Sequence, residues 1–349
     1  MARKPKSKPK PINLALQGGG AHGAFTWGVL DALLAEPGIE IAAISGTSAG
    51  ALNGAAVKSG LSQGSRDLAV ETLAWVWEEV GAITDPAFAP WLDMVSPQAV
   101  SAVLETSLPF LAGDAYSRTF SPYATGPFYA NPLEPIVSKF HYDDICCDAG
   151  PDFFICATNV RSGKIRIFSG EDISPQAIMA SACLPTMFRA VEITDPETGK
   201  PDAYWDGGYT GNPALFPLFA PNLPRDIVIV NINPLYRDEV PTTARGIQNR
   251  INEISFNSSL LRELRAIEFV QRLLHKGTLS GDAMKDVLIH MIADDDLMRQ
   301  LSVATKVIAT PQVIHQLRAA GKTAAEAFLR DGIDDIGEDS TVNLRAMFE

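Results

Sequence analysis

Apolar runs alternate with glycine-containing turns and helical segments over the first two thirds of the chain. Residues 41–44 form one such run, which ends in Ser45-Gly46-Thr47-Ser48-Ala49-Gly50 and continues into an alanine-rich segment. This order predicts a buried strand, a tight turn and a helix. Residues 11–16 predict an earlier strand that leads through a glycine loop into a helix, and residues 225–233 predict another buried strand. Alternation of this kind is typical of an α/β domain with a mainly parallel sheet.

The middle of the chain combines regular and irregular patterns. Residues 66–80 have helical spacing, residues 152–168 predict a hairpin, and residues 173–187 predict a short helix. Prolines and aromatic side chains replace any periodicity over residues 81–135, so we expect no regular structure there. We interpret this insertion as a cap over an apolar acyl pocket, with a plain packed connection as the alternative.

Beyond Thr243 the pattern becomes that of amphipathic helices. The predicted helices cover residues 247–274, 285–292, 303–317 with a break at Pro311, and 324–329. We therefore expect three parts along the chain. They are a disordered basic tail over residues 1–10, an α/β domain over residues 11–235, and a helical extension over residues 236–349 that packs on the core.

The net charge of −12 over 349 residues argues against an extended nucleic-acid surface. The basic run over residues 3–10 is interpreted as a solvated tail, although a weak tether to acidic lipid or granule surfaces has the same composition. It lacks the apolar segment of a secretory signal, and no later run approaches 18 apolar residues, so we expect a cytoplasmic protein. The four cysteines have no metal-site spacing and are expected to be free: Cys146, Cys147, Cys156 and Cys183.

Ser48 occupies the centre of a G-x-S-x-G sequence between Gly46 and Gly50. The two glycines remove Cβ atoms where a strained strand-to-helix turn brings backbone segments together. The hydroxyl then lies at a helix N-terminus, where N–H groups and the helix dipole favour negative charge. A nucleophile and a helix-capping serine both fit this motif when it is taken alone.

Gly18, Gly20 and Gly23 match G-x-G-x-x-G, the dinucleotide-binding fingerprint between a strand and a helix. The acid that would bind the ribose, Glu40, begins the second strand, whereas the ribose ligand belongs at the carboxyl end of that strand. Ser48 occupies that end. We therefore favour a loop whose N–H groups bind an oxyanion, and nucleotide binding through residues 18–23 is the non-enzymatic alternative.

A serine hydroxyl needs a base to remove its proton during attack. The order Ser48, Asp206, His315 is that of an α/β-hydrolase triad, but in that fold the nucleophile follows a middle strand, and only two strands fit before Ser48. Asp206 is the better base. Gly207 and Gly208 let another loop approach closely, and removal of water by aromatic neighbours would raise the pKa of the carboxyl. Those neighbours are Tyr204, Trp205 and Tyr209.

Four sequence blocks jointly resemble the patatin-like phospholipases, in order and in spacing, over residues 11–235. They are Gly18-Gly19-Gly20-Ala21-His22-Gly23, Gly46-Thr47-Ser48-Ala49-Gly50, Ala180-Ser181-Ala182-Cys183-Leu184-Pro185 and Asp206-Gly207-Gly208. The resemblance implies a three-layer α/β/α core, a Ser–Asp dyad with Ser48 as nucleophile and Asp206 as base, and neither calcium nor another cofactor. It also implies that Gly18, Gly19 and Gly20 supply the oxyanion N–H groups.

One position departs from the family pattern. The family usually has Arg or Lys where this chain has His22. A cation near the oxyanion is therefore missing here, or depends on protonation of His22 near its ordinary pKa of about 6.5. His22, Gly23, Gly46, Gly50, Gly207 and Gly208 are expected to support the motifs rather than to react.

The expected function is that of a serine acyl hydrolase, which cleaves lipid carboxylic esters through an acyl-Ser48 intermediate. Because the dyad acid must return a proton to the leaving group, esters and thioesters are favoured over peptides. The expected partner is a lipid or another acyl ester, presented at a membrane or granule surface. A thioesterase, a depolymerase of an intracellular storage polyester and an acyltransferase are the enzymatic alternatives, because water and alcohols compete for the same acyl-serine.

Overall fold

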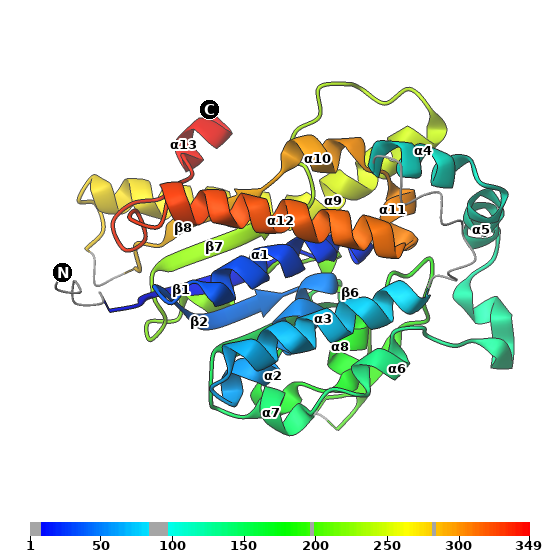
Figure 1. The fold of residues 1–349 in the computed structure, drawn as a ribbon, viewed down its shortest axis with the longest axis horizontal. Coiled ribbons are helices and arrows are strands. Elements are labelled where there is room, and N and C mark those ends of the chain that lie inside the picture. The colour runs from blue at the N-terminus through cyan, green and yellow to red at the C-terminus, as the bar shows by residue number, and fades with distance from the viewer. Residues whose placement is uncertain (1–7, 84–96, 196–198, 281–283) are drawn as a thin grey trace, which may run out of the picture.

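A mixed eight-stranded sheet forms the centre of the protein, with helices on both faces (Figure 1). This computed structural model describes residues 8–83, 97–195, 199–280 and 284–349. The strand order is β5-β6-β3-β2-β1-β7-β8, and β4 pairs with β3 outside this order. The strands are β1 (Lys10–Leu16), β2 (Ile39–Gly46), β3 (Asp152–Asn159), β4 (Ile165–Ser169), β5 (Val191–Thr194), β6 (Pro201–Asp206), β7 (Asp226–Asn231) and β8 (Leu288–Ala293).

The central strands are parallel, so their carboxyl ends lie along one edge of the sheet. β3, β2, β1, β7 and β8 pair in parallel, whereas β4 and β6 run antiparallel to β3. Strands covered on both faces are expected to be continuously apolar, and β7 is buried along its whole length. The predicted mainly parallel sheet is confirmed, and so are the predicted strands over residues 11–16, 41–44 and 225–233.

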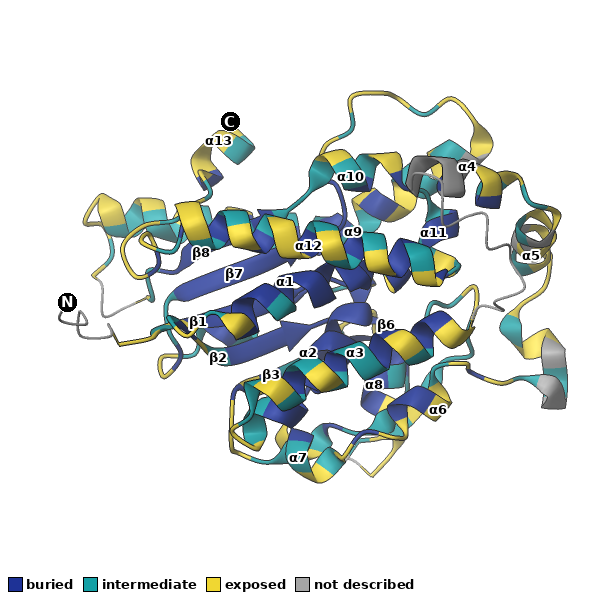
Figure 2. Cartoon of the chain, viewed as in Figure 1, coloured by how far each residue is buried: buried dark blue, intermediate teal, exposed yellow. Residues whose placement is uncertain are grey.

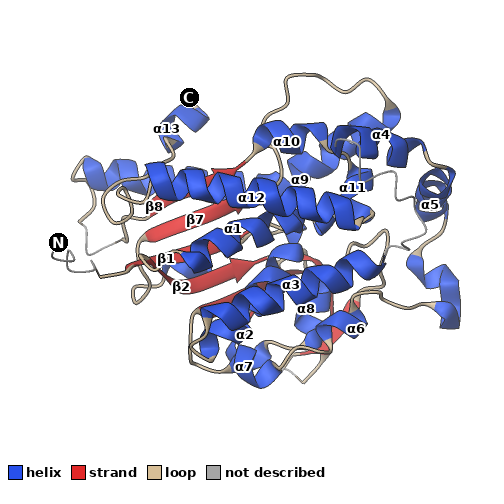
Figure 3. Ribbon diagram, in the orientation of Figure 1, coloured by secondary structure: helices blue, strands red, loops and turns tan. Residues whose placement is uncertain are grey.

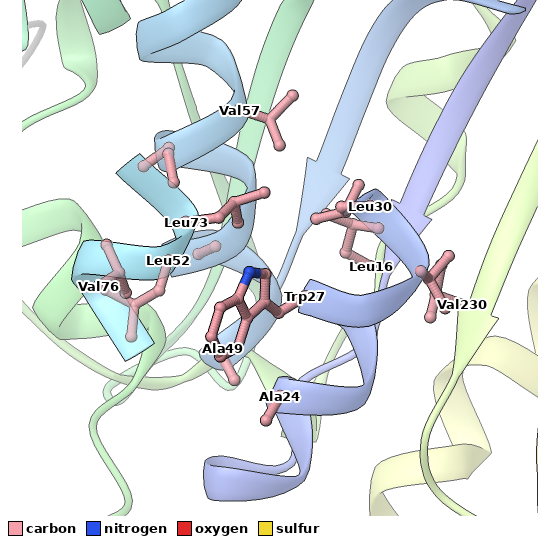
Figure 4. Close-up of a cluster of buried hydrophobic side chains, with 14 of the residues drawn as sticks. Leu16, Ala24, Trp27, Leu30, Ala49, Leu52, Val57, Leu73, Val76 and Val230 are labelled. Carbon is pink, nitrogen blue, oxygen red and sulfur yellow. The ribbon is translucent and has the colours of Figure 1, made fainter. Parts of the chain in front are cut away.

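Helices cover the face of the sheet that is turned toward the viewer in Figure 1. They are α1 (Gly23–Ala35), α2 (Ala49–Ser62), α3 (Arg66–Ile83) and α12 (Pro311–Asp331). Figure 4 shows Trp27 of α1 directed toward α2 and α3, where it shares a buried cluster with Leu52 and Leu73. Figure 2 shows the strands buried and α12 divided between buried and exposed positions, as expected of an outer layer.

The opposite face is covered by α9 (Ala244–His275), which lies behind the sheet in Figure 1. Leu260 and Leu264 of this helix belong to a second buried cluster together with Ile229 of β7. The neighbouring Val228 and Val230 belong to the first cluster, because successive side chains of a strand point to opposite faces. The two clusters therefore establish the three-layer α/β/α core that the family resemblance implies.

Shorter helices surround this core (Figure 3). They are α4 (Pro97–Thr106), α5 (Leu108–Thr119), α6 (Glu134–Val137), α7 (Tyr142–Cys146), α8 (Pro175–Ser181), α10 (Asp295–Gln300), α11 (Val303–Val307) and α13 (Leu344–Phe348). Within the described ranges, no helix combines the length and the apolar composition needed to cross a bilayer. The predicted helices over residues 66–80, 247–274 and 303–317 are confirmed, and the last is interrupted before Pro311 as expected.

The helix predicted over residues 285–292 is wrong, because these residues include β8, which pairs in parallel with β7. Eight residues of mainly apolar sequence fit either structure, and the open edge of β7 selects the strand. Val228 pairs with His290, whose Nε2 lies 3.1 Å from Asp226 Oδ1. Residues 236–349 are therefore not a purely helical extension, since they contribute a strand to the sheet and α12 to one of its covering layers.

The expectation of irregular structure over residues 81–135 is also wrong for the described part. Residues 97–119 form α4 and α5, and Pro122–Phe128 forms a 3₁₀ segment. Prolines occur in the first turns of these helices, where a missing N–H group costs no hydrogen bond. Residues 84–96, including Trp91, lie outside the described residues.

The basic tail is shorter than predicted. Lys10 begins β1, and its Nζ donates to the carbonyls of Ile333, Asp334 and Ile336, each at 2.9 Å. Residues 1–7 lie outside the described residues. All four cysteines are free, as expected.

Candidate active site

Ser48 lies in a strained turn between β2 and α2. Its φ of 55° and ψ of −119° make it the one non-glycine residue with positive φ in the described part of the chain. Such a conformation costs about 1–3 kcal/mol and persists only where the surrounding structure enforces it. The Ser48 N–H donates to Ser181 Oγ at 2.8 Å, and the Ser181 hydroxyl donates to the Cys156 carbonyl at 2.6 Å. Ser181, at the end of α8, therefore links the turn to β3.

The glycines of both motifs allow backbone segments to meet around Ser48. A Cβ at Gly46 would lie 2.5 Å from the Gly50 carbonyl oxygen, and one at Gly50 would overlap the Leu16 carbonyl. A Cβ at Gly18 would lie 2.7 Å from the Ser48 Cβ. The glycine loop after β1 is thus packed directly against the Ser48 turn, as the two neighbouring strand ends require.

Asp206 reaches the same place from an antiparallel strand. In the register of the sheet, Gly46 pairs with Ile155, and Asp206 pairs with Ala157, two residues farther along β3. Ser48 lies two residues beyond Gly46, so the side chains of Ser48 and Asp206 are at the same level along the sheet. The Ser48 side chain interacts with the Asp206 carboxyl and lowers its pKa.

The Asp206 side chain is buried, with 2% of its surface exposed. Burial raises its pKa from 3.8 to about 7, against the opposing effects of the Gly208 N–H, which donates to Oδ1 at 2.7 Å, and of the Ser48 side chain. Phe256 of α9 packs against the loop that follows Asp206: it would overlap a Cβ at Gly208, and its ring centroid lies 5.1 Å from that of Tyr209. The sequence predicted the direction of the pKa shift but gave no signal for Phe256.

Three backbone N–H groups near Ser48 have no acceptor among the residues that the structure describes. They belong to Gly19, to the exposed Gly20 and to Ala49, the first residue of α2. The Gly18 N–H, expected to be a third donor of the loop, instead donates to Asn212 Oδ1 at 2.7 Å. Ala49 was not among the predicted donors, although it follows the serine of the motif.

His22 is buried and uncharged near neutral pH. Thr305 donates its hydroxyl to the Ser302 carbonyl at 2.8 Å, so the 2.9 Å contact between Thr305 and His22 Nε2 has the histidine as donor. Burial lowers the pKa of His22 well below 6.5, and the positive charges of Lys306 and Arg237 lower it further. His22 therefore supplies no cation in this range.

The other histidines of the second half of the chain have different neighbours. His275 Nε2 lies 3.8 Å from Asp286, His290 contacts Asp226, and the His315 ring lies 6.5 Å from that of Trp27. In the described ranges, no three His, Cys, Asp or Glu side chains are placed to hold a metal ion.

A family model described as patatin-like phospholipase matches residues 14–219, which is more than half of the chain. The chain belongs to the patatin-like phospholipase family. The matched residues of this patatin-like protein include the glycine loop, the Ser48 turn and Asp206, and the family domain is that of a hydrolase acting on lipid ester bonds.

Solved structures similar to this patatin-like protein include VipD from Legionella pneumophila and the type III effector protein ExoU. For VipD the identity is 14% and the TM-score 0.29, with 90% of this chain and 67% of that chain covered. For ExoU the identity is 15% and the TM-score 0.31, with 93% of this chain and 54% of that chain covered. For the ExoU–SpcU complex of the Pseudomonas aeruginosa type III secretion system, the identity is 18% and the TM-score 0.28, with 95% of this chain and 62% of that chain covered. These low TM-scores support no further argument, and a search of curated proteins gave no match.

Proposed function

We propose that this protein is a serine acyl hydrolase that cleaves lipid carboxylic esters, as phospholipases A and lysophospholipases do, with Ser48 as nucleophile and Asp206 as base. The observation that carries the proposal is the register of the sheet, which brings Ser48 to the level of the buried Asp206 carboxyl, whose pKa burial raises to about 7. A carboxyl group with this pKa can accept a proton during attack and return it at neutral pH.

The reaction proceeds in two half-reactions. The Ser48 oxygen attacks the ester carbonyl carbon while Asp206 takes its proton, and the N–H groups of Gly19, Gly20 and Ala49 bind the oxyanion. Asp206 then protonates the departing alkoxide, which leaves an acyl-Ser48 ester. Water attacks this ester with Asp206 again as base, so the fatty acid is released and Ser48 recovers its proton.

A single carboxyl group suits some leaving groups better than others. An alkoxide or a thiolate needs less assistance from an acid than an amine does, so esters and thioesters are the expected substrates. Residues 11–235 form the proposed catalytic unit, and we expect it to act in the cytoplasm on substrate at a membrane or granule surface.

Fluorophosphonate labelling tests the assignment of the nucleophile. We expect a single phosphonylated peptide that contains Ser48, and loss of both labelling and hydrolysis in Ser48→Ala. Ser62→Ala, at the other end of the helix that follows Ser48, is the matched control and should keep both. Labelling of another serine would overturn the assignment. Turnover of a phospholipid, a lysophospholipid, an acyl thioester and a hydroxyalkanoate polyester, compared in parallel, then identifies the class of ester.

A further inference from the structure

Buried amide side chains hold the peptide groups of the glycine loop. Gly18 donates its N–H to Asn212 Oδ1 at 2.7 Å, and its carbonyl accepts from Asn233 Nδ2 at 2.8 Å. Both asparagines are at least 98% buried. Asn233 follows β7, and Asn212 follows the Asp206 loop, so two segments distant in sequence hold the two peptide groups on either side of Gly18.

Gln17 determines which way the Asn233 amide is oriented. Its Oε1 accepts from the Asn233 backbone N–H at 3.1 Å and from Asn233 Nδ2 at 3.2 Å. With Nδ2 directed at these acceptors, Asn233 Oδ1 is left to accept from Lys306 Nζ at 2.8 Å. Lysine can only donate, so this orientation gives each of these contacts one donor and one acceptor.

The contact at the Gly18 carbonyl has a consequence for Gly19. The C=O of Gly18 and the N–H of Gly19 belong to one planar trans peptide group and point in opposite directions. Holding the carbonyl therefore fixes the direction of the Gly19 N–H, which has no acceptor among the described residues. A positive charge at the other end of the hydrogen-bonded chain also polarises this peptide group and strengthens its N–H as a donor.

Lys306 is held at this position by α11, which packs on the loop. A Cβ at Gly20 would overlap the Lys306 carbonyl, so the helix backbone touches the loop itself. Two charged groups face Lys306, namely Glu253 of α9 and Arg237 of the segment before α9. The titratable but neutral His22 also faces it. Glu253 also pairs with Arg237 at 2.6 Å and with Arg250 at 3.2 Å. Burial lowers the pKa of Lys306 to about 8, with Arg237 adding to the effect and Glu253 opposing it.

We propose that Lys306 and Asn233 form a positioning relay, which holds and polarises the Gly18–Gly19 peptide so that the Gly19 N–H binds the oxyanion. The proposal rests on the proposed function, since it assigns these residues to the same reaction. Neither side chain touches the substrate. Their effect should therefore fall on kcat and not on KM, because the oxyanion exists only after the substrate has bound.

The test compares Lys306→Met and Lys306→Arg with the wild type, and uses Lys139→Met as a control because Lys139 pairs with Glu79 elsewhere on the surface. We expect Lys306→Met to lower kcat about 10- to 100-fold. This is no more than the decrease in kcat that removal of one oxyanion donor causes. KM should stay within about twofold of the wild-type value. Lys306→Arg should retain most of the activity. The rate of fluorophosphonate labelling should fall with kcat, because phosphonylation uses the same oxyanion donors.

The pH profile supplies a measurement that a purely structural role would not change. Wild-type kcat should fall as the pH rises through about 8, where Lys306 loses its charge, and this alkaline limb should move upward in Lys306→Arg. If Lys306→Met does not fold by circular dichroism, Asn233→Asp replaces it, because aspartate accepts from Lys306 but cannot donate to Gly18.

The outcomes separate the two proposals. Absence of labelling at Ser48 in the wild type overturns the proposed function and the relay together. The relay alone is overturned if Ser48 is labelled and a folded Lys306→Met variant has a kcat within twofold of the wild-type value. A wild-type kcat that stays constant from pH 8 to 10 also overturns the relay alone.

Discussion

Replacement of Asp206 by Asn should remove nearly all activity and stabilise the protein at the same time. The asparagine oxygen can still accept the Gly208 N–H, but the amide cannot take a proton from Ser48. We therefore expect kcat to fall by about 10²- to 10⁴-fold, the usual contribution of a general base. Stability should rise because the variant no longer buries a carboxylate that must be charged at high pH.

The size of the gain follows from the pKa shift. Because the folded pKa is about 7 and the ordinary value 3.8, the unfolded chain releases this proton first, so the stability of the wild type falls as the pH rises from 3.8 to 7. Each unit of difference corresponds to about 1.4 kcal/mol. Relative to the wild type, Asp206→Asn should thus gain about 4 kcal/mol at pH 8, about 2 kcal/mol at pH 5 and nothing at pH 3.

Urea unfolding at these three pH values measures the gain as a shift of the midpoint at constant slope. Glu263→Gln is the matched control. Burial raises the pKa of Glu263 from 4.5 to about 7, and its Oε2 accepts the N–H groups of Leu215 and Phe216 at 2.9 and 2.8 Å. This variant should gain about 3 kcal/mol at pH 8 and keep its activity. An Asp206→Asn variant that is no more stable than the wild type at pH 8, or equally stabilised at pH 3, would refute the reasoning.

Three further predictions concern neighbouring groups. In pH–rate measurements, wild-type kcat should rise through about pH 7 as Asp206 loses its proton. His22→Gln should leave this acidic limb of the profile unchanged, because His22 stays neutral. A limb that moves in His22→Gln would contradict the assignment of the limb to Asp206. Ser181→Ala should lower both kcat and the urea midpoint, by about 1–3 kcal/mol in stability, because the Ser48 N–H and the Cys156 carbonyl both lose a partner. Leu108 begins α5 with 81% of its surface exposed. If residues 81–135 contact aggregated lipid, Leu108→Ser should slow hydrolysis of a micellar long-chain ester, while a short soluble ester is cleaved as before. Equal losses of activity on both substrates would exclude that role.

The sequence predicts well the elements that depend on neighbours along the chain. The strand, turn and helix around Ser48 follow from Gly46, Gly50 and the apolar run before them, because crowding within the turn selects residues without Cβ. β1 and β7 were recognisable for a related reason: strands covered on both faces are continuous apolar runs.

The failures occur where the local pattern permits two structures. Residues 285–292 fit a helix or a strand, and only pairing with β7 makes them β8. The prolines of residues 97–128 suggested irregular structure, yet Pro109 and Pro122 lie in first turns, where the missing N–H has no helical partner to lose.

The chemistry of the site divides in the same way. The sequence alone predicted Ser48 as nucleophile and Asp206 as base, through four motif blocks taken together and not through either motif by itself. The tertiary structure decided that the β3 register places these two at one level, that α9 packs against the Asp206-Gly207-Gly208 loop, and that Lys306 lies behind the glycine loop. Proton affinity and hydrogen-bond direction depend on atoms within a few ångströms, and here those atoms come from segments up to 288 residues apart, as between Gly18 and Lys306.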